Sequence, residues 1–174
     1  MSYVYFFRGK AATGKTTITN ILSNQLKVAV LRKDDIFDSL STYIEDNSVN
    51  SNAAYDILAR LIQTNIDNQS DVIVDVGLFF TTGFKQFISK LDLRSNNFII
   101  FHCDCTDVDI WKNRFQERLK NPTPNQYFSN VDEIINYYSN SKIELLENEY
   151  VIDSSKNLGD IMENIYSILG KTTI

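Results

Sequence analysis

Two patterns of apolar residues alternate along the chain. Short, almost uniformly apolar runs are typical of strands buried on both faces, whereas apolar residues three and four positions apart predict helices. Runs of the first kind predict strands at residues 3–7, 28–31, 72–76, 98–103 and 150–152. Stretches of the second kind predict helices at residues 16–26, 53–66, 84–91, 106–119, 131–147 and 158–169.

Local signals refine the ends of these elements. Thr106 and Asp109 match a capping box, which predicts that the fourth of these helices opens there. The Asn-Pro-Thr-Pro stretch at 121–124 breaks that helix, and Gly170 is placed to end the last one. Residues 39–52 are rich in serine and asparagine, so we expect an irregular surface segment.

The alternation of strands and helices predicts an α/β fold with a parallel sheet covered on both faces. A length of 174 residues is enough for one buried core and short for two, which predicts a single domain over residues 1–174. The composition, 43% apolar and 22% charged, is that of an ordinary globular protein.

Composition and charge exclude several classes of protein. No apolar run approaches the roughly 18 residues of a membrane helix, and residues 1–7 lack the features of a signal peptide. Cys103 and Cys105 are too close in sequence for an unstrained disulfide, which favours reduced thiols in a cytoplasmic protein. The net charge of −5 disfavours a broad nucleic-acid surface.

One motif carries specific chemistry. Residues 9–16, Gly-Lys-Ala-Ala-Thr-Gly-Lys-Thr, fit the phosphate-binding pattern G-x-x-x-x-G-K-[ST] between a predicted strand and a predicted helix. Such a loop wraps phosphates in backbone N–H groups and points the positive end of the helix at them. Lys15 would bridge the β- and γ-phosphates, and the Thr16 hydroxyl would bind Mg²⁺. No guanine-recognition motif of the NKxD type is present, which favours ATP.

Acidic residues follow two predicted strands at the edge where ligands bind in parallel sheets. Asp34 or Asp35 can accept a proton from an acceptor hydroxyl, although an aspartate here can also cap the next helix. Asp75 resembles a Walker B acid near Mg²⁺, or else a polar strand end. Gly77 can let a substrate approach the backbone, or simply form a turn.

Basic residues offer further candidates. Arg114 and Arg118 lie four apart on one predicted helix face, where arginines can stabilise a transferring phosphoryl group or simply face solvent. Arg60 can reach substrate from its amphipathic helix, but a surface role is the simpler interpretation. The single histidine, His102, lies within an apolar strand, and both it and Trp111 are interpreted as packing residues.

Together these blocks resemble the small P-loop kinases, a group that includes the kinase domain of polynucleotide kinase, chloramphenicol phosphotransferase, zeta toxins and shikimate-kinase-like enzymes. The resemblance covers nearly the whole chain. It is carried by GKAATGKTT at 9–17, RKDD at 32–35, VIVDVG at 72–77, FHCDCTDVDIWKNRFQER at 101–118 and YVIDSS at 150–155.

The resemblance implies a three-layer fold with a five-stranded parallel sheet, a helical lid at about 114–130 and a substrate region at about 36–60. It implies that Asp34 is the base, that Arg114 lies on the adenine or lid side, and that Arg118 sits over the phosphates. The loop 153–156 would border the adenine. The implied nucleotide-binding residues are Gly9, Lys10, Ala11, Ala12, Thr13, Gly14, Lys15, Thr16, Thr17, Arg114 and Arg118.

These observations favour an ATP- and Mg²⁺-dependent phosphotransferase with a small-molecule hydroxyl acceptor, such as an antibiotic, a sugar or a nucleoside. Lys15, Asp34 and Arg118 are its expected catalytic residues, and Thr16 and Asp75 its metal ligands. Asp34, Asp35, Arg60 and Gly77 are the expected acceptor-side residues. Two alternatives remain: a kinase for a nucleic-acid 5′-hydroxyl, which would need a basic groove beside Asp34, and a non-catalytic ATP-dependent switch.

Overall fold

The computed structural model describes residues 2–93, 97–139 and 144–170, and in them five strands form one parallel sheet. The strands are β1 (Tyr3–Gly9), β2 (Val30–Arg32), β3 (Val72–Asp75), β4 (Asn97–Asp104) and β5 (Glu149–Asp153), in the order β2-β3-β1-β4-β5. The helices are α1 (Lys15–Leu26), α2 (Lys33–Ser41), α3 (Asn47–Asp67), α4 (Thr81–Ile88), α5 (Val108–Leu119), α6 (Val131–Ser139) and α7 (Leu158–Ile168).

Alternate residues of the central strand β1 pack into two separate cores, one on each face of the sheet. Val4 and Phe6 lie in the core covered by α3 and α4. Tyr5 and Phe7 lie in the core covered by α1 and α7. Because successive side chains of a strand point to opposite faces, a continuous apolar run fills both cores. The α/β fold with a parallel five-stranded sheet is therefore confirmed.

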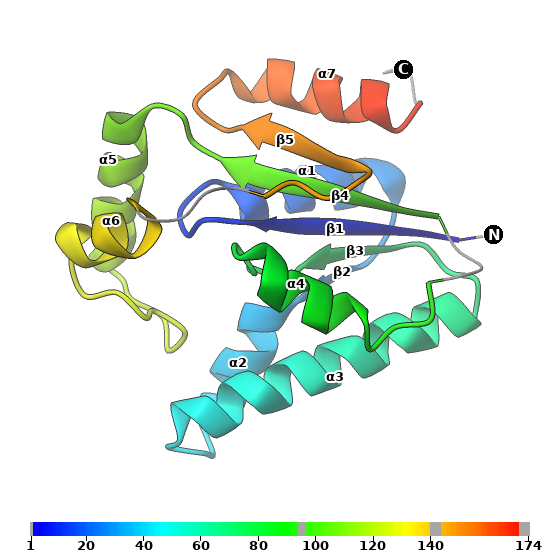
Figure 1. Cartoon of the computed structure of the whole chain (residues 1–174), viewed down its shortest axis with the longest axis horizontal. Helices are drawn as coiled ribbons and strands as arrows, with labels where there is room; N and C mark the ends of the chain where they lie inside the picture. Colours follow the sequence, from blue (N-terminus) through cyan, green and yellow to red (C-terminus); the bar gives the residue numbers. More distant parts are fainter. Residues whose placement is uncertain (1, 94–96, 140–143, 171–174) are drawn as a thin grey trace.

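A third, smaller core lies beyond the carboxyl ends of the strands, where Figure 1 shows α5 and α6 together. Trp111 and Phe115 of α5 pack there against Phe128 and against Ile134 of α6. Ala11 and Ala12 of the loop after β1 pack against the same cluster. These two helices are therefore attached to the end of the sheet where ligands bind in parallel α/β folds.

Two helices begin at caps that the sequence pattern missed. Helix α3 starts at Asn47 rather than at residue 53, because the Asp46 side chain accepts hydrogen bonds from the Ser48 and Val49 amides. The predicted irregular segment thus shrinks to residues 42–46. Helix α5 is capped by Asp107 and not by Thr106, whose hydroxyl instead donates to Asp153 Oδ2 at 2.7 Å.

Other predicted boundaries also move. Strand β2 begins at Val30 rather than at residue 28, and α4 covers Thr81–Ile88 rather than 84–91. The helix predicted over 131–147 is described to Ser139, and residues 144–148 are not helical. The part of that prediction over 140–143 lies outside the described residues. In the described ranges, no helix combines the length and the apolarity needed to cross a membrane.

A buried ion pair ties the beginning of β5 to the centre of the sheet. The Arg8 guanidinium on β1 donates to both carboxylate oxygens of Glu149, at 2.5 and 2.8 Å. It also donates to the Phe79 carbonyl and to the Thr81 hydroxyl, in the segment that leads into α4. His102 of β4 lies beside the pair, with Nδ1 3.4 Å from Glu149 Oε1. The single histidine is therefore buried next to an ion pair, outside the cavity described below.

Candidate active site

The loop between β1 and α1 has the backbone that a phosphate-binding loop requires. Gly9 has a φ of 135°, and a Cβ there would lie 2.0 Å from the Cys103 carbonyl oxygen of β4. Ala12 and Gly14 also have positive φ, at 61° and 78°. Gly14 precedes the first residue of α1, so the positive end of that helix faces the space the loop encloses.

Lys15 and Thr16 lie where the motif predicts. The Lys15 ammonium donates to the carbonyls of Gly9 and Lys10, at 3.2 and 2.6 Å, and so spans the loop from inside. The Thr16 hydroxyl donates to Asp75 Oδ2 at 3.4 Å. Loop, lysine and hydroxyl thus converge on one cavity.

Asp75 ends β3, which pairs directly with β1, and only 9% of it is exposed. Burial raises the pKa of its carboxyl, the Lys15 ammonium opposes that rise, and the Asp34 carboxylate adds to it. Asp75 therefore lies close to the loop, and a nearby cation stabilises its ionised form.

The Thr16 hydroxyl and the Asp75 carboxylate fit the requirements of Mg²⁺. This ion prefers oxygen ligands and takes few from the protein, because it retains water and binds phosphate oxygens. Among the described residues, no group of three or more histidine, cysteine, aspartate or glutamate side chains is placed to hold a metal. The pair thus suits a magnesium–nucleotide complex better than a closed, all-protein metal site.

The two aspartates after β2 have different positions. Both lie in the first turn of α2, and Arg32 precedes that helix without a side-chain cap, so the interpretation that one of them caps it is wrong. Asp34 lines the cavity with its side chain 51% exposed, and its Oδ1 is 3.6 Å from the Lys33 ammonium. Asp35 lies outside the cavity lining, 71% exposed, beside Arg32.

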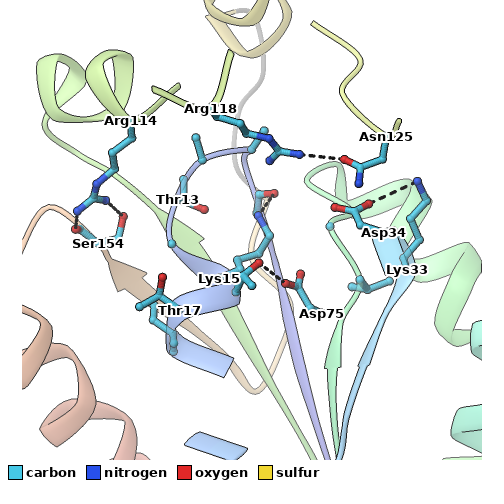
Figure 2. Close-up of a pocket in the computed structure, with 18 of the residues that line it drawn as sticks. Thr13, Lys15, Thr17, Lys33, Asp34, Asp75, Arg114, Arg118, Asn125 and Ser154 are labelled. Carbon is cyan, nitrogen blue, oxygen red and sulfur yellow. Dashed lines mark hydrogen bonds and ion pairs between the residues drawn. The ribbon is translucent and has the colours of Figure 1, made fainter. Parts of the chain in front are cut away.

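Arg114 and Arg118 both line the cavity from α5, but they contact different parts of the protein. Arg114 donates to the hydroxyl and the carbonyl of Ser154, both at 3.0 Å, in the loop after β5. Arg118 donates to Asn125 Oδ1 at 2.9 Å, in the loop between α5 and α6. Figure 2 shows the two guanidinium groups on opposite sides of the phosphate-binding loop.

Asn125 is a site residue that sequence reasoning missed. Its backbone N–H donates to Asp38 Oδ1 at 2.8 Å, and its side-chain amide donates to both Asp38 carboxylate oxygens at 3.0 Å. The Asn-Pro-Thr-Pro break marked the loop, but no sequence signal pairs it with α2. Asn125 thereby connects Arg118 to the helix that carries Asp34.

The cavity has a volume of about 590 Å³ and two sides. On the side of Arg114, its lining comes from Thr17, from the loop after β5 and from the start of α7. On the side of Asp34, it comes from α2, α3, the segment after β3 and the loop before α6. The lining of the second side includes Lys33, Asp34, Tyr55, Gly77, Asn125, Tyr127, Phe128 and Tyr138.

Of the remaining candidate residues, the structure places some in the cavity lining and others outside it. Gly77 lines the cavity with a φ of 71°. Arg60 is exposed on α3 and is not part of the cavity lining. Cys103 and Cys105 are buried free thiols, and burial raises the pKa of Cys103 to about 12. Trp111 packs as predicted and also donates from Nε1 to the Ala11 carbonyl at 2.8 Å, so it braces the phosphate-binding loop.

Solved structures with the same fold cover nearly the whole chain. A protein of Chloroflexus aurantiacus J-10-fl has a TM-score of 0.74 and 16% identity, covering 95% of this chain and 97% of its own. A sugar kinase from Janibacter sp. HTCC2649 has a TM-score of 0.64 and 15% identity, covering 99% and 100%.

An APS kinase of Mycobacterium tuberculosis, solved with AMPPNP and APS, has a TM-score of 0.63 and 12% identity, covering 98% of each chain. Identities this low show the fold alone. A search of the curated proteins found no match.

The sequence itself gives the family. The family model described as an AAA domain matches residues 4–135, which contain the phosphate-binding loop, Asp34, Asp75 and both arginines of α5. The chain therefore belongs to this AAA domain family and has the P-loop kinase fold.

Proposed function

We propose that the protein is an ATP- and Mg²⁺-dependent phosphotransferase that moves the γ-phosphate to a hydroxyl of a small-molecule acceptor. One observation carries the proposal. A single cavity contains a phosphate-binding loop, the Thr16–Asp75 oxygen pair and the half-exposed carboxylate of Asp34. A nucleotide site alone would not need a second carboxylate facing the same cavity.

Each residue takes a role that its position supports. Lys15 and the loop amides hold the β- and γ-phosphates, and Thr16 and Asp75 hold Mg²⁺ directly or through water. Arg118 faces the phosphates and neutralises charge as the phosphoryl group moves. Arg114, fixed on Ser154, borders the nucleotide on the opposite side.

Asp34 accepts the proton of the acceptor hydroxyl. The hydroxyl oxygen forms the new bond to the γ-phosphorus while the bond to the bridging oxygen breaks, and ADP leaves with that oxygen. Because the protein forms no covalent bond, the rate comes from positioning and from electrostatic stabilisation. Asp35 and Arg60 lie outside the cavity, so the proposal gives them no part.

The surroundings of Asp34 favour a small acceptor over a nucleic acid. The basic groove needed for a polynucleotide would draw on Arg32, Lys33 and Lys85. Each of them is engaged: Arg32 with Asn20, Lys33 with Asp34, and Lys85 with Glu144. A polynucleotide would have to replace these partners with its phosphates.

The test is ADP release with Mg²⁺-ATP across a panel of acceptors. The panel contains aminoglycosides, phenicols, macrolides, nucleosides, sugars and 5′-hydroxyl oligonucleotides. We expect one class of small molecules to stimulate release, with a phosphorylated product detected by mass spectrometry. Stimulation by oligonucleotides alone, falling steeply with salt, would support the nucleic-acid alternative. Tight ATP binding without stimulation by any acceptor would support the switch.

A further inference from the structure

Four aromatic side chains line the cavity on the side of Asp34. Tyr127, Phe128 and Tyr138 line it from the loop before α6 and from α6 itself, and Tyr55 lines it from α3. These four residues are called the aromatic wall below. Rings of this kind offer flat apolar faces, which bind other flat or apolar rings.

Neighbouring rings hold the aromatic wall in place. Phe128 packs edge-to-face on Tyr127, with centroids 5.1 Å apart, and lies 6.0 Å from Tyr138. The Tyr138 hydroxyl accepts a hydrogen bond from the Ala11 amide at 3.2 Å, which ties this ring to the phosphate-binding loop. Tyr127, by contrast, is 83% exposed, so most of its surface is open to a ligand.

Tyr55 completes the aromatic wall close to the proposed base. Burial raises the pKa of its hydroxyl, and the nearby Asp34 carboxylate raises it further, so Tyr55 stays a neutral donor. The Lys33 ammonium lies 5.6 Å from the centre of the Tyr55 ring and 4.3 Å from that of Phe37. A ring bound beside Tyr55 would therefore have its substituents near Asp34.

The charges on this side do not suit an anionic acceptor. Its carboxylates are Asp34 and Asp75. Of its cations, Lys33 lies against Asp34 and two aromatic rings, and Arg118 serves the transferring phosphoryl group in the proposed function. An acceptor carboxylate or phosphate here would add like charge in a partly buried site, which is unfavourable.

We infer that the acceptor is an uncharged alcohol that carries a flat ring, bound against Tyr127 and Tyr55 with its hydroxyl directed at Asp34. The inference rests on the proposed function and names the substrate class of that same cavity. Nucleosides and aryl-substituted alcohols both have this chemistry, whereas sugar acids and phosphorylated sugars do not.

The test measures equilibrium binding by calorimetry to protein saturated with AMPPNP and Mg²⁺. Phenyl β-D-glucoside, methyl β-D-glucoside and phenyl β-D-glucuronide share one sugar frame and separate the effect of the ring from that of the charge. Uridine and methyl riboside form a second pair that differs in the ring. We expect the ring to tighten binding about tenfold in at least one pair, and the glucuronide to bind more weakly than the glucoside.

Two tyrosines give a matched pair of variants. Tyr127→Ala should abolish most of the ring preference without changing AMPPNP affinity. Tyr43→Ala, which removes a ring that is 87% exposed outside the cavity lining, should change neither. No ring preference in either pair, tighter binding of the glucuronide, or unaltered ring preference in Tyr127→Ala would each overturn the inference.

ADP release, measured in parallel, separates this inference from the proposed function. Suppose that the ring preference is lost in Tyr127→Ala but no acceptor stimulates ADP release. This result would support the ring-binding site and contradict the proposed transferase function. ADP release stimulated only by anionic acceptors would support the proposed transferase function and contradict the inferred substrate class.

Discussion

Asn125 donates three hydrogen bonds to Asp38 and accepts one from Arg118, so one asparagine links α2, the helix that carries Asp34, to an arginine that lines the cavity. Asp38 lies one helical turn after Asp34, on the same side of α2. Any movement of the loop before α6 therefore changes how Arg118 is held relative to the proposed base.

We expect Asn125→Ala to lower kcat about tenfold and to change the affinity for ATP by less than about threefold. The reason is that Arg118 keeps its charge but loses the partner that orients it, and misplaced groups lose rate before they lose binding. Steady-state kinetics with calorimetry of ATP binding would measure both effects. Asn121→Ala, an exposed asparagine in the same loop, is the control and should behave as wild type. An Asn125→Ala enzyme with unchanged kcat would contradict the role of this contact.

Asp34→Asn should retain nucleotide affinity and lose phosphoryl transfer by about two orders of magnitude or more, because the amide cannot accept the acceptor's proton. The measurement is single-turnover product formation under saturating Mg²⁺-ATP. Asp35→Asn makes the same change of charge one residue away, outside the cavity lining, and should retain most of the activity. Equal losses in the two variants would remove Asp34 from the mechanism.

Much of the fold was predictable because buried parallel strands leave a strong signal. The run around Phe6 and Phe7 is apolar throughout, since the two residues fill opposite cores. The caps were harder to predict. Asp46 and Asp107 each have a polar neighbour that could also cap the helix, Asn47 in one case and Thr106 in the other, so the hydrogen bonds that decide the helix start are not visible in the periodicity.

The placement of the loop, Lys15 and Thr16 around one cavity was predictable because these residues follow a local motif. The contact between Asp38 and Asn125 was not, because 87 residues separate them and only the packed loop brings them together. The same limit applies to the aromatic wall, because Tyr55 belongs to α3 and Tyr138 to α6. The sequence alone also could not tell which of Asp34 and Asp35 lines the cavity. The structure shows that it is Asp34.

Glu149→Gln should weaken the dependence of the free energy of unfolding on pH in the acid range. Burial opposes ionisation of this carboxyl, yet the neighbouring His102 and the hydrogen bonds from Arg8 outweigh burial and lower the pKa of Glu149 to about 2. A pKa below the unfolded value of 4.5 means that the contribution is complete above about pH 5 and is lost as pH falls toward 2. Urea unfolding between pH 3 and 7 would measure this slope.

At pH 7 the same variant should be less stable by about 3 kcal/mol, because the buried Arg8 loses its carboxylate. Glu147→Gln, at an exposed position two residues earlier, should keep both the stability and the slope. If Glu149→Gln lost stability toward acid pH as steeply as wild type, other carboxylates would be responsible for that loss.

Gly9→Ala should disrupt both the sheet and the nucleotide site. The new Cβ would meet the Cys103 carbonyl oxygen at 2.0 Å, and a φ of 135° is open to glycine almost alone. Because Gly9 pairs with Cys103 where β1 becomes the phosphate-binding loop, relief of the clash must shift that loop. We expect a loss of about 2–4 kcal/mol in urea unfolding and at least a tenfold loss of ATP affinity by calorimetry. Gly83→Ala is the control: it lies inside α4 with only an ordinary 3.6 Å contact to Leu78, and it should gain about 0.5–1 kcal/mol. Wild-type ATP affinity in folded Gly9→Ala would show that the loop tolerates the shift.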